Sequence, residues 1–319
     1  MTTEKELHVV FGAGQVGPPL AQRLAAAGHR VRLVRRSEAP AAIPGVEAVR
    51  ADARDAAAAT EAARGATAVY HCMNVAYFTD RWAAELPPIL DGLIAAAGRS
   101  KARLVVLDNL YAYGRPGGRT LTEATPFAPC SRKGEIRARL HRQLEAAVQR
   151  GDVRAVTGRA ADFYGPGGVA TLFADRFWPA ALAGKPAAMI VPLDTPHTYH
   201  FIPDVAAGLA RLGQDPAAEG TWMLPCQPAE TTRALIGHLS AALGQPIQAS
   251  RMPPLLLKGL GLFMPILREL AEMGYQWEER FEVDDAKFRA RFGAIAASRD
   301  EAARQTVAWG RATFGGARR

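Results

Sequence analysis

The chain has 319 residues, a length that fits one large domain or two moderate ones. Hydrophobic residues make up 49% and charged residues 22%, an ordinary globular composition, and no apolar run is long enough to cross a membrane. The three cysteines, Cys72, Cys130 and Cys226, are far apart and indicate neither a disulfide framework nor a zinc site. The net charge of +8 comes from basic residues scattered among acids, so we expect no nucleic-acid partner.

The first predicted elements form a strand–helix–strand unit over residues 8–34. An apolar strand, 8–11, leads into Gly12-Ala13-Gly14-Gln15-Val16-Gly17, and a helical run follows as far as Gly28. In this spacing Gly12 permits a tight turn, Gly14 lets the backbone approach a pyrophosphate, and Gly17 lets the helix pack on the strand. The stretch therefore predicts a dinucleotide-binding turn, with Gln15 and Val16 as further cofactor contacts.

Two arginines and a serine stand at the tip of the second predicted strand, 31–34. A site selective for NAD places an acid there, whereas this chain has Arg35, Arg36 and Ser37. Guanidinium groups can grip a phosphate with two parallel hydrogen bonds, so we predict NADP(H) in preference to NAD(H). The alternative is a solvated charged loop.

Strands continue to alternate with helices up to about residue 165. We expect strands near 46–49, 68–73, 104–107 and 153–156, and helices through Ala63, over 86–97 and from 129–134 onward. This order predicts an α/β fold with a Rossmann-type, doubly wound parallel sheet. We expect residues 1–165, joined by parts of 198–226, to form the cofactor domain, and 166–319 to form mainly a smaller substrate lobe.

Polar residues that follow the parallel strands are candidate site residues, because such strand ends border the cofactor crevice. Asn74 is a predicted cofactor contact and Tyr77 a predicted substrate contact. We interpret Trp82 as a packing residue and His71, inside an apolar strand, as a hydrogen-bonded core residue. The pair His197 and His200 could touch substrate, and we expect no metal site.

The apolar stretch from Leu255 to Leu267 is expected to be a buried helix of the smaller lobe, with a membrane-surface or dimer contact as the alternative. The chain enters its first strand within a few residues, so we expect no signal peptide and a cytoplasmic location. A homodimer is possible, and we expect no membrane partner.

Together these segments resemble the NAD-dependent epimerase/dehydratase family, in the atypical extended branch of the short-chain dehydrogenase/reductase superfamily. The resemblance spans nearly the whole chain. It implies that Asp52, in 51–55, meets the adenine, and that the segment 159–166 lies beside the nicotinamide, with Asp162 as a candidate substrate contact. The segments 199–206 and 283–309 are also similar to the family pattern.

The chain departs from that family where the chemistry is expected. The family uses a Ser or Thr followed by Tyr-x-x-x-Lys, but Asn109 takes the hydroxyl position, and Pro129 stands four residues before Lys133. We predict Tyr111 as proton donor, Asn109 as carbonyl polariser, and Lys133 as the group that binds the nicotinamide ribose and tunes the tyrosine. Alternation along the strand end favours Tyr111 over Tyr113, and the alternative is that both aromatic side chains only pack the loop.

The predicted function is NADP(H)-dependent hydride transfer to or from a carbonyl or secondary alcohol of a small molecule. Tyr77, Tyr113, Asp162 and His197 are the predicted substrate contacts. A sugar-nucleotide epimerase or dehydratase is one alternative, for which Arg176 and Arg233 could accept a diphosphate. A cofactor-binding sensor that has lost catalysis is the other.

Overall fold

A computed structural model describes residues 5–37 and 42–316. Its internal contacts divide the chain into two compact units. Unit 1 comprises Met1–Ala112, Arg132–Ala160 and Val205–Leu224, and unit 2 comprises Tyr113–Ser131, Ala161–Asp204 and Pro225–Arg319. The functional division into a cofactor domain and a substrate lobe remains a prediction.

Unit 1 is built on a seven-stranded sheet in the order β11-β6-β5-β4-β1-β2-β3, with every neighbouring pair parallel. Its strands are β1 (Leu7–Phe11), β2 (Arg30–Arg35), β3 (Val46–Arg50), β4 (Ala68–His71), β5 (Arg103–Asp108), β6 (Arg154–Arg159) and β11 (Gly220–Met223). The chain moves outward from β1 to β3 and then returns to β4 on the other side of β1. This reversal confirms the predicted Rossmann-type, doubly wound fold and puts the switch point between β1 and β4.

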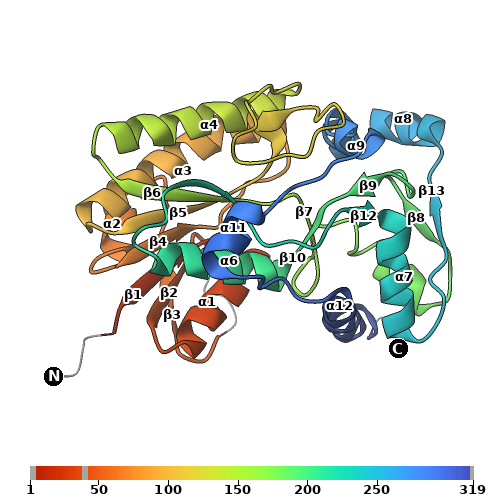
Figure 1. The fold of residues 1–319 in the computed structure, drawn as a ribbon, viewed down its shortest axis with the longest axis horizontal. Helices are drawn as coiled ribbons and strands as arrows, with labels where there is room; N and C mark the ends of the chain where they lie inside the picture. Colours follow the sequence, from red (N-terminus) through yellow and green to blue (C-terminus); the bar gives the residue numbers. More distant parts are fainter. Residues whose placement is uncertain (1–4, 38–41, 317–319) are drawn as a thin grey trace. The chain divides into compact units, whose positions relative to one another are not determined.

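Helices cover both faces of this sheet (Figure 1). Helices α2 (Ala56–Ala62), α3 (Thr79–Arg99) and α4 (Arg132–Gln149) lie on one side, and α1 (Gly17–Ala26) and α6 (Ile202–Gln214) lie on the other. One continuous core joins β1, β4 and β5 to α2, α3 and α4, with Phe11, Val69, Leu93 and Leu104 at most 1% exposed. A parallel sheet buried on both faces explains why its strands are almost uninterrupted apolar runs.

Helix α3 differs from the sequence expectation, because it begins at Thr79 rather than at residue 86 and contains Pro87 and Pro88 in its interior. A proline removes one helical N–H, which is why the sequence favours a later start. Trp82 and Leu86 are at most 1% exposed and pack together in this first part of the helix. Burial of these large side chains outweighs the local cost of the prolines.

Unit 2 has three two-stranded sheets and several helices around its own core. Its strands are β7 (Asp162–Tyr164), β8 (Ala187–Met189), β9 (Pro196–His197), β10 (Tyr199–Phe201), β12 (Glu230–Thr231) and β13 (Ala249–Arg251). Its helices are α5 (Trp178–Leu182), α7 (Thr232–Leu243), α8 (Pro254–Phe263), α9 (Pro265–Glu272), α10 (Tyr275–Glu278), α11 (Ala286–Phe292) and α12 (Arg299–Phe314). A Cβ atom on Gly310 would lie 2.5 Å from the Trp178 ring, so α12 packs against α5 by means of this glycine.

The prediction of one buried helix over Leu255–Leu267 is wrong. The stretch forms two short helices, α8 and α9, and Leu255 and Phe263 are 83% and 85% exposed. Pro265 divides the two helices because it cannot continue the first one. The apolar residues surround α8 without a helical period, so only part of them can face the protein.

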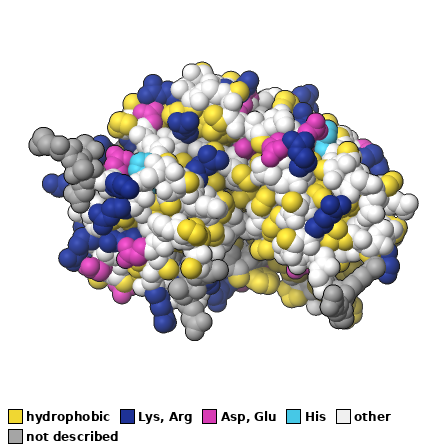
Figure 2. Space-filling view, turned by 90° about the horizontal axis from the view of Figure 1, so that it is seen from below, with side chains coloured by type: hydrophobic (Ala, Val, Ile, Leu, Met, Phe, Trp, Pro, Cys, Tyr) yellow, Lys and Arg dark blue, Asp and Glu magenta, His cyan; other side chains and the backbone are white. Residues whose placement is uncertain are grey.

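Two surface properties bear on the predicted partners. On the face drawn in Figure 2, Lys and Arg side chains are scattered rather than gathered into a stripe. Within residues 5–37 and 42–316, no helix is both long enough and apolar enough to cross a membrane. The possible homodimer remains a prediction.

Candidate active site

The glycine turn lies between the carboxyl end of β1 and α1. Gly12 has a φ of +112°, and a Cβ atom there would lie 2.6 Å from the carbonyl oxygen of Cys72. A Cβ atom on Gly17 would lie 1.7 Å from the carbonyl oxygen of Gly12, whereas one on Gly14 would meet no atom of the described residues within 4 Å. Gly12 and Gly17 therefore have the steric roles predicted for them, and Gly14 leaves its side of the turn open.

The start of α1 has the electrostatic character of an anion site. No acidic residue lies in its first turn, and the side chain of Val16 does not cap it. Pro18 and Pro19 carry no N–H, so the backbone donors at this end of the helix come from residues 14–17. These donors, with the positive end of the helix dipole, suit the pyrophosphate of a dinucleotide.

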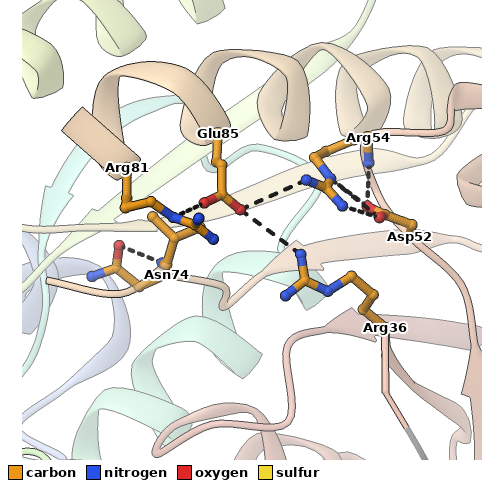
Figure 3. Close-up of polar contacts among 7 residues, drawn as sticks. Arg36, Asp52, Arg54, Asn74, Arg81 and Glu85 are labelled. Atoms are coloured by element: carbon orange, nitrogen blue, oxygen red, sulfur yellow. Dashed lines mark hydrogen bonds and ion pairs between the residues drawn. The ribbon is translucent and has the colours of Figure 1, made fainter. Parts of the chain in front are cut away.

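Arginines from three parts of unit 1 surround the Glu85 carboxylate (Figure 3). The nitrogen-to-oxygen distances are 3.8 Å from Arg36 at the end of β2, 3.7 Å from Arg54 after β3, and 2.5 Å from Arg81 on α3. Beside this group, the guanidinium of Arg35 donates two hydrogen bonds to Ser37 Oγ, at 3.1 and 2.7 Å.

Sequence reasoning identified Arg35, Arg36 and Ser37 but missed the other members of this group. Arg81 and Glu85 are spaced i, i+4 in sequence, which was the available signal. Arg54 lies in the segment 51–55, which had already been singled out for Asp52, and this position was a signal that it is part of the site. These arginines form a cationic region that contains two carboxylates, the buried Glu85 and the half-exposed Asp52.

The two aspartates of the 51–55 segment have different surroundings. Asp52 accepts hydrogen bonds from the backbone N–H of Arg54 at 3.0 Å and from its guanidinium Nε at 3.0 Å. These contacts, led by the side-chain bond from Arg54, lower the pKa of the Asp52 carboxyl. Asp55 caps α2 by accepting from the N–H groups of Ala57 and Ala58.

A tyrosine pair lies beside a buried lysine near the ends of β4 and β5. The hydroxyls of Tyr77 and Tyr111 are 3.0 Å apart, and both side chains are half-buried. The fully buried Lys133 Nζ donates to Thr79 Oγ1 at 3.1 Å and lies 4.8 Å from the centre of the Tyr77 ring. The Trp82 ring stacks on Tyr111 with an interplanar angle of 9°. The structure thus brings together three predicted residues and adds Thr79, which the sequence analysis missed.

The Asn109 side chain stabilises the turn that carries Tyr111. Its Oδ1 accepts a hydrogen bond from the Tyr111 N–H at 3.1 Å, while its own N–H donates to Asp108 Oδ1 at 2.8 Å. Tyr111–Tyr113 is a 3-10 turn, so the alternation argument that favoured Tyr111 over Tyr113 is wrong in its premise. A turn of three residues per rotation does not have the two-residue period of a strand.

A buried charge network, missed from the sequence, supports this region. The guanidinium of Arg137 contacts Asp108 Oδ1 at 3.4 Å and Asn74 Oδ1 at 3.3 Å, and lies over the Trp82 ring. Arg159 reaches the other oxygen of Asp108 at 3.4 Å. Arg137 follows Lys133 by four residues on α4, which puts both cations on one helix face.

The other predicted substrate residues belong to unit 2. His197 is fully buried, and its Nε2 lies 2.7 Å from Asp162 Oδ2 while its Nδ1 faces the Gln276 carbonyl at 3.1 Å. The Asp162 side chain is 25% exposed. Tyr113 is 2% exposed and packs edge-on against Phe127.

Two further histidines have structural partners. His200 is fully buried and accepts from the N–H of Ala161 at 3.1 Å. His71, in unit 1, is 5% exposed and accepts from the N–H of Met73 at 3.3 Å, which agrees with its interpretation as a core residue.

A model of the NAD dependent epimerase/dehydratase family matches residues 8–222, so the chain belongs to this family. No match was found among curated proteins.

Solved structures with the same fold include sugar-nucleotide enzymes. UDP-N-acetylglucosamine 4-epimerase from Methanobrevibacter ruminantium M1, in complex with UDP-N-acetylmuramic acid, is 15% identical, with a TM-score of 0.76 over 96% of this chain and 98% of that one. UDP-glucose 4-epimerase from Thermus thermophilus, in complex with NAD, is 20% identical, with a TM-score of 0.74 over 96% and 99%. The dTDP-glucose 4,6-dehydratase of Streptomyces venezuelae, with NAD bound, is 18% identical, with a TM-score of 0.74 over 97% and 98%.

Proposed function

We propose that the protein is an NADP(H)-dependent oxidoreductase that acts on a carbonyl or secondary alcohol of a small molecule. The observation that carries the proposal is the tyrosine pair beside Lys133, at the same sheet edge as the glycine turn. When bound, the nicotinamide would accept or supply the hydride. The turn at residues 12–17 would hold its pyrophosphate, and the open side of Gly14 fits that role.

The tyrosine pair would exchange a proton with the substrate oxygen. The two hydroxyls are within hydrogen-bond distance, so a proton that leaves one can be replaced from the other. The Lys133 ammonium is 4.8 Å from the Tyr77 ring, and its positive charge favours negative charge on the pair after the proton has left. We assign Tyr111 as the group that meets the substrate and Tyr77 as the one that shares its proton.

The first test removes each hydroxyl separately. With NADPH and a panel of carbonyl compounds, we expect Tyr111→Phe and Tyr77→Phe each to lower kcat by about 100-fold or more, the usual contribution of a general acid. Tyr199→Phe is the matched control, because its hydroxyl bonds Thr232 Oγ1 at 2.8 Å inside unit 2. Full turnover by Tyr111→Phe on an active substrate would show that the proton-donor assignment is wrong. If the parent binds NADPH but oxidises it with no compound of the panel, the non-catalytic sensor is favoured.

The preference for NADP(H) rests on the arginines at the end of β2. Arg35, Arg36 and Ser37 lie together there, and the Arg36 side chain is 61% exposed and therefore open to a phosphate. Arg54 and Arg81 add positive charge nearby, although Glu85 offsets part of it. The solved relatives with NAD in their complexes do not decide this preference, because the specificity rests on local side chains.

Cofactor preference is measured by fluorescence titration of NADPH and NADH. We expect the parent to bind NADPH more tightly, and Arg35→Ala and Arg36→Ala to weaken NADPH by about tenfold or more with little effect on NADH. Arg64→Ala is the control, because Arg64 is 77% exposed in the same unit and pairs with Glu61. Equal affinity of the parent for both cofactors would contradict the 2′-phosphate assignment.

A sugar-nucleotide epimerase or dehydratase is the second candidate, favoured by membership of the family and by the complexes of its solved relatives. In unit 2, Arg233 already forms a two-bond pair with Asp194, at 2.6 and 2.9 Å, so a diphosphate would have to replace that carboxylate. The two candidates differ in net cofactor chemistry. An epimerase converts its sugar nucleotide without net change in reduced cofactor, which absorbance and chromatography of the same reaction separate.

A further inference from the structure

The amino ends of β1 and β2 bring together a second group of chemically active side chains, away from the glycine turn. Glu6 immediately precedes β1, and His8 is its second residue, so both side chains point to one face of the strand. The β1–β2 register pairs Leu7 with Arg30, and the Arg30 N–H donates to the Glu6 carbonyl at 3.0 Å. This register brings His29 next to the other two residues.

The three side chains offer nitrogen and oxygen atoms to one common point. His8 Nε2 is 3.6 Å and His29 Nδ1 is 3.7 Å from Glu6 Oε2, and all three atoms lie within 4.8 Å of one another. Ligands bound to a tetrahedral Zn²⁺ at about 2.0–2.1 Å are about 3.3 Å apart, so a modest closure of the group would accommodate the ion. The carboxylate is 52% exposed and His29 is 20% exposed, which leaves both free to make that adjustment.

The His8 ring is already held in an orientation that suits a metal ligand. It is fully buried, and its Nδ1 is 2.8 Å from the hydroxyl of Tyr70, which is also fully buried. Its Nε2 is buried and has no hydrogen-bond partner within the described residues. Metal-bound histidines use one nitrogen for the ion and the other for a partner of this kind.

The His29 ring has a similar second contact. Its Nε2 lies 2.8 Å from the side-chain amide nitrogen of Gln214 on α6. Rotation of this amide by 180° would bring its oxygen to the ring, so that Nε2–H donates to it and Nδ1 is left to bind a cation.

We propose that Glu6, His8 and His29 form a site for a divalent transition-metal ion such as Zn²⁺. Two imidazoles and one carboxylate are a ligand set that Zn²⁺ accepts, with water completing the coordination. The ion would join the beginnings of β1 and β2, so its role is to stabilise unit 1 and not to take part in hydride transfer.

The test is a titration of the untagged full chain, stripped of metal, with Zn²⁺ in competition with a chromophoric chelator. We expect one ion per chain and a higher thermal midpoint when the ion is bound. Glu6→Gln and His29→Asn, both at exposed or half-exposed positions, should each weaken Zn²⁺ by more than tenfold. Tyr70→Phe, which removes only the hydroxyl behind His8, should weaken it by about 10-fold to 100-fold.

His238→Asn is the matched control, because His238 also faces a carboxylate, Glu230, at 3.3 Å but lies in unit 2. It should leave Zn²⁺ affinity unchanged. Substitution with Co²⁺ gives an independent readout, since its visible absorption should appear in the parent and the control and be lost in Glu6→Gln and His29→Asn. Binding that is equal in all variants, or no binding to the parent, would overturn the proposal.

Discussion

The two edges of the unit 1 sheet gather side chains in different ways. The carboxyl edge carries the glycine turn at the start of α1, the half-buried pair Tyr77 and Tyr111, and the exposed Arg36. At the amino edge, a single buried imidazole, His8, has two partly exposed neighbours, Glu6 and His29. The first arrangement suits a large anionic ligand and the second a single cation. If both proposals hold, the same sheet serves two kinds of ligand, one at each end of its strands.

The largest effect is expected when alanine replaces a glycine of the turn at the carboxyl edge. We expect Gly17→Ala to lower the free energy of unfolding by about 3 kcal/mol, because its Cβ would lie 1.7 Å from the Gly12 carbonyl oxygen. Gly14→Ala should leave stability nearly unchanged, since no atom in the described part of the chain lies within 4 Å of the added Cβ, but should weaken dinucleotide binding by about tenfold, or 1.4 kcal/mol. Denaturant unfolding and NADPH titration of both variants measure the two effects. Unchanged dinucleotide affinity in Gly14→Ala would show that the open side of the turn does not face the cofactor.

The fold and the glycine turn could be predicted from the sequence because both depend on local patterns. Apolar runs define the buried strands, and the spacing of Gly12, Gly14 and Gly17 reflects steric demands within one turn. The start of α3 and the burial of α8 were predicted wrongly for the opposite reason. Both depend on which side chains the rest of the protein covers. Trp82 is covered and buried, whereas Leu255 is left exposed.

A pH titration of the free energy of unfolding tests the buried His71. Burial lowers the pKa of His71, near the carboxyl edge, to about 4 from its usual 6.5. The unfolded chain takes up a proton on this residue below about pH 6.5, whereas the folded chain does so only near pH 4. Stability from this group is therefore complete above pH 6.5 and falls through that window, by about 2 kcal/mol between about pH 7 and pH 5.

The measurement is denaturant unfolding across this pH range for the parent and for His71→Gln, which keeps an acceptor for the Met73 N–H. The variant should show a shallower loss of stability on acidification. His238→Gln, at a 34% exposed surface position, should retain the parental slope. Identical slopes for His71→Gln and the parent would mean that His71 is not the group that takes up the proton.

The candidate site was only partly predictable because its residues come from separate elements. Tyr77, Tyr111 and Lys133 were each chosen from the sequence, but no local pattern gives the 3.0 Å distance between the hydroxyls or the position of Thr79. The amino-edge group was missed altogether. Glu6, His8 and His29 have no metal-binding spacing in sequence, and only the pairing of β1 with β2 brings them together.

The smallest effects are expected from Asp55 and Asp52, two aspartates for which we predict different roles, one in stability and one in ligand binding. Asp55→Ala removes the acceptor for the N–H groups of Ala57 and Ala58, so we expect a loss of about 1 kcal/mol in stability with unchanged dinucleotide affinity. Asp52→Ala breaks a half-exposed pair with Arg54 and should cost less than about 1 kcal/mol. If Asp52 meets the adenine, as the family resemblance implies, the same change should weaken dinucleotide binding about fivefold, the contribution of one hydrogen bond. Unfolding and NADPH titration of the two variants provide the measurement, and equal weakening of NADPH by both would contradict this division of roles.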